Sequence, residues 1–303
     1  MNIDLTEKTA SFLIIGTIVI EFLIRFFVQR KSYDHKDSFT NLLIGIGNRI
    51  ITGALWLGLM LWGFQLAYDL TPLRMQLTQW WVWPVAILMS DFSYYWYHRL
   101  AHEIRGLWVI HAVHHNSEDY NFSTSVRLSW LEGSVRWMFW LPLPLAGLAP
   151  LEAFLIYMIT RWYQVLLHTQ YVPKLGFLEK FLSTPSHHRV HHGANPKYID
   201  KNYGGMFIFW DKLFGSFQVE EEAPVYGTLK SIDSYNPVTI NFAEGVSLVK
   251  DMAHARNLKE AIGYAVHKPG WSPDGSSVSL EELFEQKCAA MRADLNVSEQ
   301  QIG

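Results

Sequence analysis

The chain has 303 residues, half of them hydrophobic, and only 17% of its side chains are charged, whereas a soluble domain usually has about 25%, so we expect part of its surface to lie in a membrane. Its net charge of −3 offers no basic surface for phosphate groups, which excludes a nucleic-acid partner. The single cysteine, Cys288, excludes an intramolecular disulfide, a thiolate zinc site and an iron–sulfur cluster.

The first predicted element is an apolar run over residues 12–28. It has no basic segment before it and no small-residue cleavage site after it, so we interpret it as a retained membrane span rather than a signal peptide. Glu21 and Arg25 are spaced i,i+4 within this run. They either pair along one helix face, or Arg25 extends to the membrane boundary.

Two further spans are predicted before the first histidine-rich segment ends. One covers residues 50–67 and follows a polar break at Asn48 and Arg49. The other begins at residue 80 and continues as a helix to residue 105, a length of about 39 Å, whereas the hydrocarbon core of a bilayer is about 30 Å thick. The last turns of this helix are therefore expected beyond the membrane surface.

An apolar segment over residues 130–168 is interrupted by Pro142, Pro144 and Pro150. Proline kinks or ends a helix, so we predict two half-length helices that dip into the membrane and return. The loops on one side of the three crossings are richer in Lys and Arg, which places the N-terminus outside and the histidine-rich segments in the cytosol. The basic residues on that side are Arg30, Lys31, Lys36, Arg49, Arg99 and Arg105, against Lys8 and Arg74 on the other.

Charged residues become frequent after Phe217, and this region is predicted to be a cytosolic extension. Ser279 and Glu282 have the spacing of a capping box, which predicts a helix from there to about Leu295. The predicted fold is all-α, a multi-pass membrane bundle with a cytosolic, histidine-rich di-metal cap. Its expected parts are N-terminal spans (1–79), a catalytic domain (80–217) and the extension (218–303).

Ten of the 13 histidines lie between positions 98 and 192. Most of them form three clusters with i,i+3 and i,i+4 spacing, which puts the imidazoles of each cluster on one helix face. Thr184 and Pro185 supply an N-cap and an N1 residue for the third cluster's helix, and Gly193 a stop. The clusters comprise His98 and His102, then His111, His114 and His115, and finally His188, His191 and His192.

These histidines outnumber the ligands of one metal ion. Imidazole binds Fe, Zn, Cu or Ni, and one ion accepts about six ligands at most, so the clusters together with His168 predict two metals. The Glu-x-x-His pairs of soluble di-iron bundles are absent from the sequence. Whether His187 binds metal is left open, because it is spaced i,i+4 with His191 but points about 100° away from His188. His35, His254 and His267 lie outside the clusters and are expected to have no metal-binding role.

Two carboxylates are predicted to assist catalysis by accepting hydrogen bonds from metal-bound imidazoles. Asp91 lies two helical turns before His98 on the same predicted face, and Glu103 directly follows His102. The aromatic run over residues 94–97 is interpreted as an interfacial belt rather than a cofactor pocket.

Together these motifs resemble the fatty acid hydroxylase / sterol desaturase superfamily of membrane histidine-cluster di-iron oxygenases. The His-x3-His motif, the two His-x2-His-His motifs and the hydrophobic hairpin between them carry the resemblance. The sequence around these motifs is most similar to that of the alkylglycerol monooxygenase branch. The similar segments are DFSYYWYHRLAHE (91–103), HNSEDYN (115–121), TPSHHRVHHG (184–193), DKNYGG (200–205), WDKLFG (210–215) and KPGWSP (268–273).

The resemblance implies that the eight clustered histidines and His168 bind two irons, and that the activity is O2-dependent hydroxylation or desaturation of a membrane lipid. The branch adds tetrahydrobiopterin as a possible reductant. Because no complete Gly-x-Gly-x-x-Gly fingerprint occurs, the electrons are expected from an external protein or a diffusible reductant. The competing hypothesis is a membrane metal-binding or metal-transport protein without oxygenase activity. A bacterial inner membrane is favoured over the endoplasmic reticulum.

Overall fold

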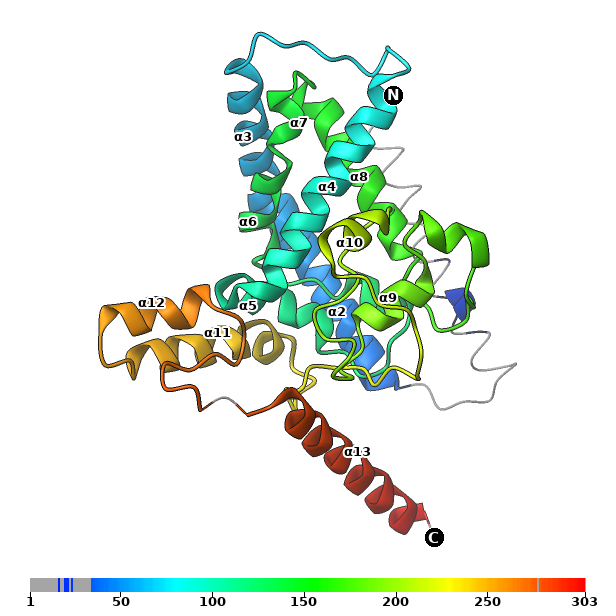
Figure 1. The fold of residues 1–303 in the computed structure, drawn as a ribbon, viewed down its shortest axis with the longest axis vertical. Helices are drawn as coiled ribbons and strands as arrows, with labels where there is room; N and C mark the ends of the chain where they lie inside the picture. The colour runs from blue at the N-terminus through cyan, green and yellow to red at the C-terminus, as the bar shows by residue number, and fades with distance from the viewer. Residues whose placement is uncertain (1–15, 17–18, 22, 24–33, 277, 303) are drawn as a thin grey trace.

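The computed structural model describes residues 16, 19–21, 23, 34–276 and 278–302 of the chain. All regular elements in this part are helices, as the sequence predicts (Figure 1). Apart from the helices, two isolated bridges join Met75 to Leu148 and Leu182 to Phe207. The predicted span over residues 12–28 lies, except for the few residues named, outside the described part.

The first long element among the described residues is a single helical rod. It consists of α2 (His35–Ile51), the π-helical turn η2 (Thr52–Trp56) and α3 (Leu57–Asp69). The helix continues through Asn48 and Arg49, so the polar break predicted there is wrong. Asn48 is buried and its amide Nδ2 donates to the carbonyl oxygen of Ser129 at 2.6 Å, so the polar side chain is satisfied without interrupting the helix. Among the described residues, this rod of 35 residues is the one helix long and apolar enough to cross a membrane.

The helix predicted over residues 80–105 is confirmed as α4, and a second helix follows it directly. α4 (Val82–Glu103) ends because Ile104 adopts an extended backbone with φ −120° and ψ 114°. α5 (Arg105–His115) then starts in a new direction, and the backbone N–H of Arg105 donates to the carbonyl of His267 at 2.9 Å. The first two histidine clusters therefore lie on two helices that pack against each other.

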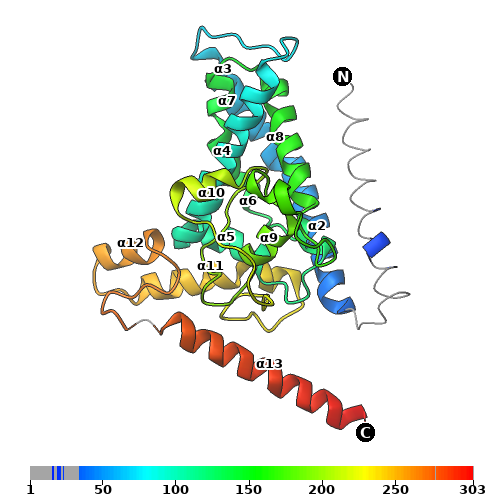
Figure 2. The same ribbon diagram turned by 45° about the vertical axis from the view of Figure 1, so that its right-hand side comes forward.

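The predicted hairpin has a broken first limb and a continuous second limb. The first comprises α6 (Glu132–Val135), the 3-10 helix η4 (Arg136–Trp140) and α7 (Pro142–Leu145), and the second is α8 (Pro150–Val165). Pro142 and Pro150 each begin a helix, where the missing N–H is not needed. The hairpin packs on α3 and α4 around a fully buried core that includes Phe64, Trp140 and Ile156. These four elements form the upright part of the molecule (Figures 1 and 2).

Short helices close the end of this bundle. They are the 3-10 turns η3 (Phe122–Val126) and η5 (Gly176–Lys180), α9 (Pro185–His191) and α10 (Phe209–Phe214). α9 begins and ends where the Thr184-Pro185 and Gly193 signals predict.

The C-terminal region contains two helices that the sequence did not indicate, α11 (Pro237–Ala253) and α12 (Leu258–Val266). Both pack against α5. The predicted last helix, α13 (Leu280–Ile302), extends past Leu295 and lies at the edge of the molecule (Figures 1 and 2). Its cap is half of the predicted box: the Ser279 hydroxyl oxygen accepts from the Glu282 N–H at 3.1 Å.

Candidate metal centre

Nine buried imidazoles converge in two groups beneath the bundle. Within each group, one ring nitrogen of every member lies within 4.8 Å of those of the others. The five-histidine group contains His98, His102, His111, His115 and His191, and the four-histidine group contains His114, His168, His188 and His192. The set coincides with the nine histidines named from the sequence, and His187 belongs to neither group.

Helix geometry decides which histidine joins which group. On α5, His111 and His115 are one turn apart and face the five-histidine group, whereas His114 points toward the other group. On α9, His191 faces the five-histidine group, and His188 faces the four-histidine group. Each of these helices therefore divides its triplet between the two groups.

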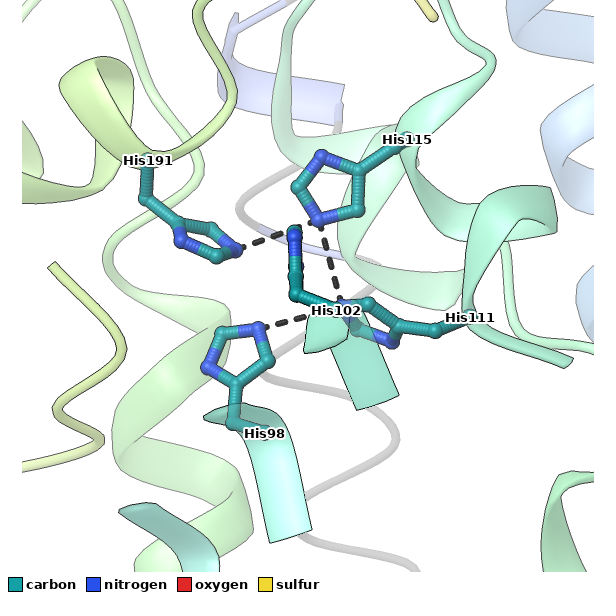
Figure 3. Close-up of side chains that lie close together, drawn as sticks. All are labelled: His98, His102, His111, His115 and His191. Atoms are coloured by element: carbon teal, nitrogen blue, oxygen red, sulfur yellow. Dashed lines mark hydrogen bonds between the residues drawn. The ribbon is translucent and has the colours of Figure 1, made fainter. Parts of the chain in front are cut away.

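The ring nitrogens of the five-histidine group face a common point (Figure 3). The Nε2 atom of His111 lies 3.1 Å from that of His98 and 3.2 Å from that of His115, which in turn lies 3.1 Å from Nε2 of His191. Two nitrogens bound at about 2.1 Å to one metal ion, at right angles, are about 3.0 Å apart. The observed spacing is therefore that of ligands around a single ion.

The four-histidine group has the same spacing. Nε2 of His168 lies 3.2 Å from that of His114 and 3.1 Å from that of His188. His168 follows the C-terminal end of α8, so the hairpin carries it to the same level as α5 and α9.

Backbone carbonyls fix the orientation of several rings. The Nδ1 atoms of His98 and His191 face the carbonyl oxygens of Tyr203 and Lys201 at 2.8 and 2.9 Å. Nδ1 of His168 faces the carbonyl oxygen of Gln164 at 2.9 Å. A proton on Nδ1 satisfies each of these contacts and leaves the Nε2 lone pair free for a metal ion.

Burial keeps these imidazoles neutral, which is the form that binds metal. It lowers the pKa of His114 to about 3 and that of His191 to about 4. In each group one buried Nε2 atom, that of His102 and that of His192, has no hydrogen-bond partner. A buried polar atom is usually paired, so an ion in each group would supply the missing partner. The residues present therefore fit two metal ions.

Asp91 does not accept a hydrogen bond from a histidine, in contrast to the prediction. Its buried carboxylate accepts from the N–H groups of Met206 at 2.6 Å and Phe207 at 3.0 Å, and from the indole of Trp210 at 3.1 Å. These donors lie on the segment after α9, which also provides the Tyr203 carbonyl for His98. Asp91 thus holds a supporting loop in place.

Glu103 also has another partner, since it pairs with Arg99 at 3.2 Å on the half-exposed side of α4. Among the described residues, the carboxylate paired with a histidine of the two groups is instead Asp200, which the sequence singled out only as part of the DKNYGG segment. Asp200 Oδ1 lies 3.8 Å from Nδ1 of His102, and its other oxygen pairs with Lys268 at 2.9 Å. Asp200 rather than Glu103 is therefore the carboxylate beside His102, at a distance longer than a hydrogen bond.

The remaining predictions concern residues around the groups. His187 accepts a long hydrogen bond from the Thr184 backbone N–H through Nδ1, at 3.4 Å, so it caps the start of α9. The interfacial-belt interpretation of residues 94–97 is wrong for the tyrosines, which are buried. Tyr94 packs against His98 and Tyr97 against His111, with ring centroids 4.9 and 6.5 Å apart.

Residues 83–216 match the family model described as fatty acid hydroxylase. The alkylglycerol monooxygenase of Homo sapiens is 40% identical over 203 residues, which cover 67% of this chain and 45% of that protein. The alkylglycerol monooxygenase of Xenopus tropicalis is 33% identical over 290 residues, or 93% of this chain and 63% of that protein. The ornithine lipid hydroxylase of Rhizobium tropici is 34% identical over 152 residues, which cover 45% of this chain and 43% of that protein. The chain thus spans less than two thirds of the length of these relatives, and no solved structure matches it.

Proposed function

Because residues 83–216 of this chain form a fatty acid hydroxylase domain, we propose that the protein is an oxidoreductase that uses O2 to hydroxylate a membrane lipid at a pair of irons. The single observation that carries this proposal is the convergence of nine buried imidazoles on two points. Relatives named as lipid hydroxylases and as a sterol desaturase support a lipid substrate, and desaturation is the related outcome.

The roles of the chain's own residues follow from the geometry. The nine histidines hold the two ions, and the carbonyls of Tyr203, Lys201 and Gln164 keep the Nε2 atoms directed inward. Tyr94 and Tyr97 close the side of the site that faces the bundle and exclude water from it. Two irons bound there would supply the activation of O2 and the removal of hydrogen from an unactivated C–H bond.

We propose a membrane location for two reasons: the long rod exposes many apolar side chains, and Lys and Arg are more frequent in the loops on one side of the predicted crossings. Ile50 and Trp62 on this rod are 65% and 61% exposed, and many of its other large apolar side chains are also exposed. Such a surface is stable in lipid but not in water. We propose that α2–α3, α4 and the hairpin form a multi-pass bundle with the histidines on the cytosolic side.

Topology can be tested with single cysteines in a Cys288→Ser background. Lys230 and Thr78 are exposed. Thr78 lies just before the start of α4, whereas the Lys230 carbonyl accepts from Thr228, whose hydroxyl also contacts Asn116 at the end of α5, beside the histidine groups. A membrane-impermeant thiol reagent applied to intact cells should label Thr78→Cys, and should label Lys230→Cys only after the cells are opened. Labelling of both from the same side would contradict the proposed crossing.

Electrons must come from outside the chain under this proposal. An electron-donor protein and tetrahydrobiopterin are the two candidates, and each can be added to purified protein in turn.

The function is tested with the purified, iron-loaded full chain, a chemical reductant and 18O2. We expect about two irons per chain and one atom of 18O in the product formed from 1-O-hexadecylglycerol or another lipid in a native extract. Iron bound without O2-dependent lipid product, together with metal uptake into vesicles containing the protein, would favour the metal-transport alternative and overturn the proposal.

A further inference from the structure

An exposed apolar patch lies on η5, on the residues that flank it, and on α10. Phe177 in η5 and Leu213 in α10 are each 67% exposed. Together with them, three other exposed apolar side chains form what we call the η5–α10 patch: Leu175, Leu178 and Phe181. Single exposed apolar residues are common on proteins, whereas a group of this kind marks an interaction surface.

The two parts of the patch are joined by hydrogen bonds. The backbone N–H of Ile208, at the start of α10, donates to the carbonyl of Phe181 at 3.0 Å. Nζ of Lys212 on α10 donates to the carbonyl of Lys180 at the end of η5, at 2.9 Å. The rings of Phe177 and Phe181 pack against each other, with centroids 5.4 Å apart. The patch is therefore one continuous surface rather than a set of independent side chains.

The patch continues the apolar outer face of α4. Exposed apolar side chains recur on this face at helical spacing, at Val85, Leu88 and Phe92. The Phe92 ring packs against those of Trp210 and Phe214 on α10, with centroids 5.0 and 6.5 Å away. Because Phe92 precedes the ligand His98 by six residues, α10 meets α4 about 9 Å to the bundle side of that ligand. Figure 1 shows α10 beside the lower part of α4.

The exposed charges that accompany the patch are mainly positive. They belong to three exposed lysines, Lys174, Lys180 and Lys212. The carboxylate of Glu179 is directed toward the protein, because its Oε1 atom accepts from the Leu175 N–H and from the Thr184 hydroxyl, both at 3.0 Å. Exposed aromatic and leucine side chains with lysines beside them are typical of a segment that lies in the interface of an anionic membrane.

We propose that the η5–α10 patch inserts into the cytosolic leaflet of the membrane and gathers anionic phospholipid there. Phe177 and Leu213 lie among the upper parts of the acyl chains, and the three lysines extend to the phosphate groups. This inference rests on the proposed membrane location and adds a contact surface outside the proposed spans, together with a lipid class. The cytosolic leaflet is the anionic one, so the charge of the patch matches the side on which the histidines are proposed to lie.

Insertion of the patch would fix the metal ligands relative to the bilayer. Glu179 in η5 binds the hydroxyl of Thr184, which is the N-cap residue of α9. α9 in turn carries His188 of the four-histidine group and His191 of the five-histidine group. The patch is therefore connected to both groups through one short helix, and lipid bound at the patch would keep that helix at the membrane surface.

Fluorescence quenching by brominated lipids tests which lipid contacts the patch. Phe177→Cys in a Cys288→Ser background is labelled with an environment-sensitive fluorophore, and the full chain is placed in nanodiscs of equimolar phosphatidylcholine and phosphatidylglycerol. The acyl chains of one lipid or of the other carry bromine, which quenches a fluorophore in contact with them. We expect both lipids to quench, and brominated phosphatidylglycerol to quench at least about twofold more strongly at low salt, because the lysines attract the anionic lipid.

A charge variant separates the lysines from the apolar contact. Lys180→Gln should reduce the excess quenching by brominated phosphatidylglycerol and leave quenching by brominated phosphatidylcholine unchanged. High salt should act in the same way, since it screens exposed charges. Lys259→Gln is the matched control, because Lys259 is also exposed but lies on α12, outside the patch, and it should change neither signal.

A second labelled position, Trp62→Cys on the exposed side of α3, reports the proposed membrane location by itself. Quenching there without quenching at Phe177→Cys would overturn the inference and leave the membrane location intact. Equal quenching at Phe177→Cys by the two brominated lipids would also overturn it, because the patch would then have no preference for anionic lipid. Blue-shifted emission without quenching would show that protein, such as a second copy of the chain, covers the patch instead. Absence of quenching at both positions would contradict the membrane location itself, whereas oxygenase function is measured separately by product formation.

Discussion

The two histidine groups are similar in spacing but differ in how the surrounding chain supports them. In the four-histidine group, His168 faces the carbonyl of Gln164 in the last turn of α8, and His114 faces that of Arg127 at 3.3 Å. In the five-histidine group, His98 and His191 depend on carbonyls of a loop after α9, those of Tyr203 and Lys201.

That loop has an unfavourable backbone. Asp200 and Asn202 both have left-handed φ angles, 59° and 55°, which cost energy for residues other than glycine. Asp211 stabilises the loop by accepting from the N–H groups of Tyr203 at 2.7 Å and Gly204 at 2.8 Å. Burial raises the pKa of Asp211 to about 6, so these hydrogen bonds are needed to keep its carboxylate charged. The five-histidine group therefore depends on the strained loop after α9, whereas the carbonyls that face the four-histidine group come from the end of α8 and from Arg127 at the end of η3.

The largest expected effect comes from removing one ligand from either group. His191 and His192 are neighbours in the chain but belong to different groups. His191→Ala should release the metal of the five-histidine group and His192→Ala that of the other, so each should lower the iron content from about two to about one per chain and abolish oxygenation. Elemental analysis and product formation measure this.

His254→Ala and His267→Ala are the controls, because neither histidine belongs to a group. Both should keep the iron content and activity of the wild type. If His191→Ala and His192→Ala each lost both irons, the two groups would behave as one cooperative site, and the contrast between them would not hold.

A smaller effect is expected from Asp211→Asn, which weakens the loop without touching a ligand. Loss of an outer hydrogen-bond partner typically lowers metal affinity by about 10- to 100-fold. Only one of the two irons should be affected, so titration with a chelator should become biphasic. Glu152→Gln is the matched control, because the Glu152 carboxylate also accepts backbone N–H groups, those of Leu77 and Ala149, but lies at the start of α8, at the opposite end from His168. Equal weakening of both irons by Asp211→Asn would contradict the assignment of this loop to one group.

The sequence predicted the ligands better than their arrangement. Helical spacing and the resemblance were sufficient to name nine histidines, since both depend on neighbouring residues. The division of His111, His114 and His115 between two groups depends on how α4, α5 and α9 pack, and spacing along one helix does not determine this. Asp91 was assigned to a histidine from its helix face, but its carboxylate binds backbone N–H groups of a loop 115 residues later in the chain.

The sequence does not single out Arg136, for a related reason. In a segment of apolar residues, a single arginine resembles one that extends to the membrane boundary. Its ion pair with Glu132 was visible as i,i+4 spacing, but the rings that enclose its guanidinium come from α4, η4 and α8. Only the tertiary structure brings the buried Nε and Nη2 atoms of Arg136, which have no hydrogen-bond partner, next to the rings that pack against His98 and His111.

The smallest expected effect concerns the ion pair between Asp200 and Lys268, at the outer edge of the five-histidine group. Lys268 is 57% exposed, and pairs of this kind contribute at most about 1 kcal/mol because water and salt screen them. Lys268→Ala should therefore lower the affinity of one iron less than about fivefold, and less at high salt, while Asp200→Ala should lower it more because Asp200 also lies beside His102. Chelator titration at low and high ionic strength measures both variants. If Lys268→Ala lowered the affinity as much as Asp211→Asn, the C-terminal extension, rather than the loop after α9, would be the main support of this group.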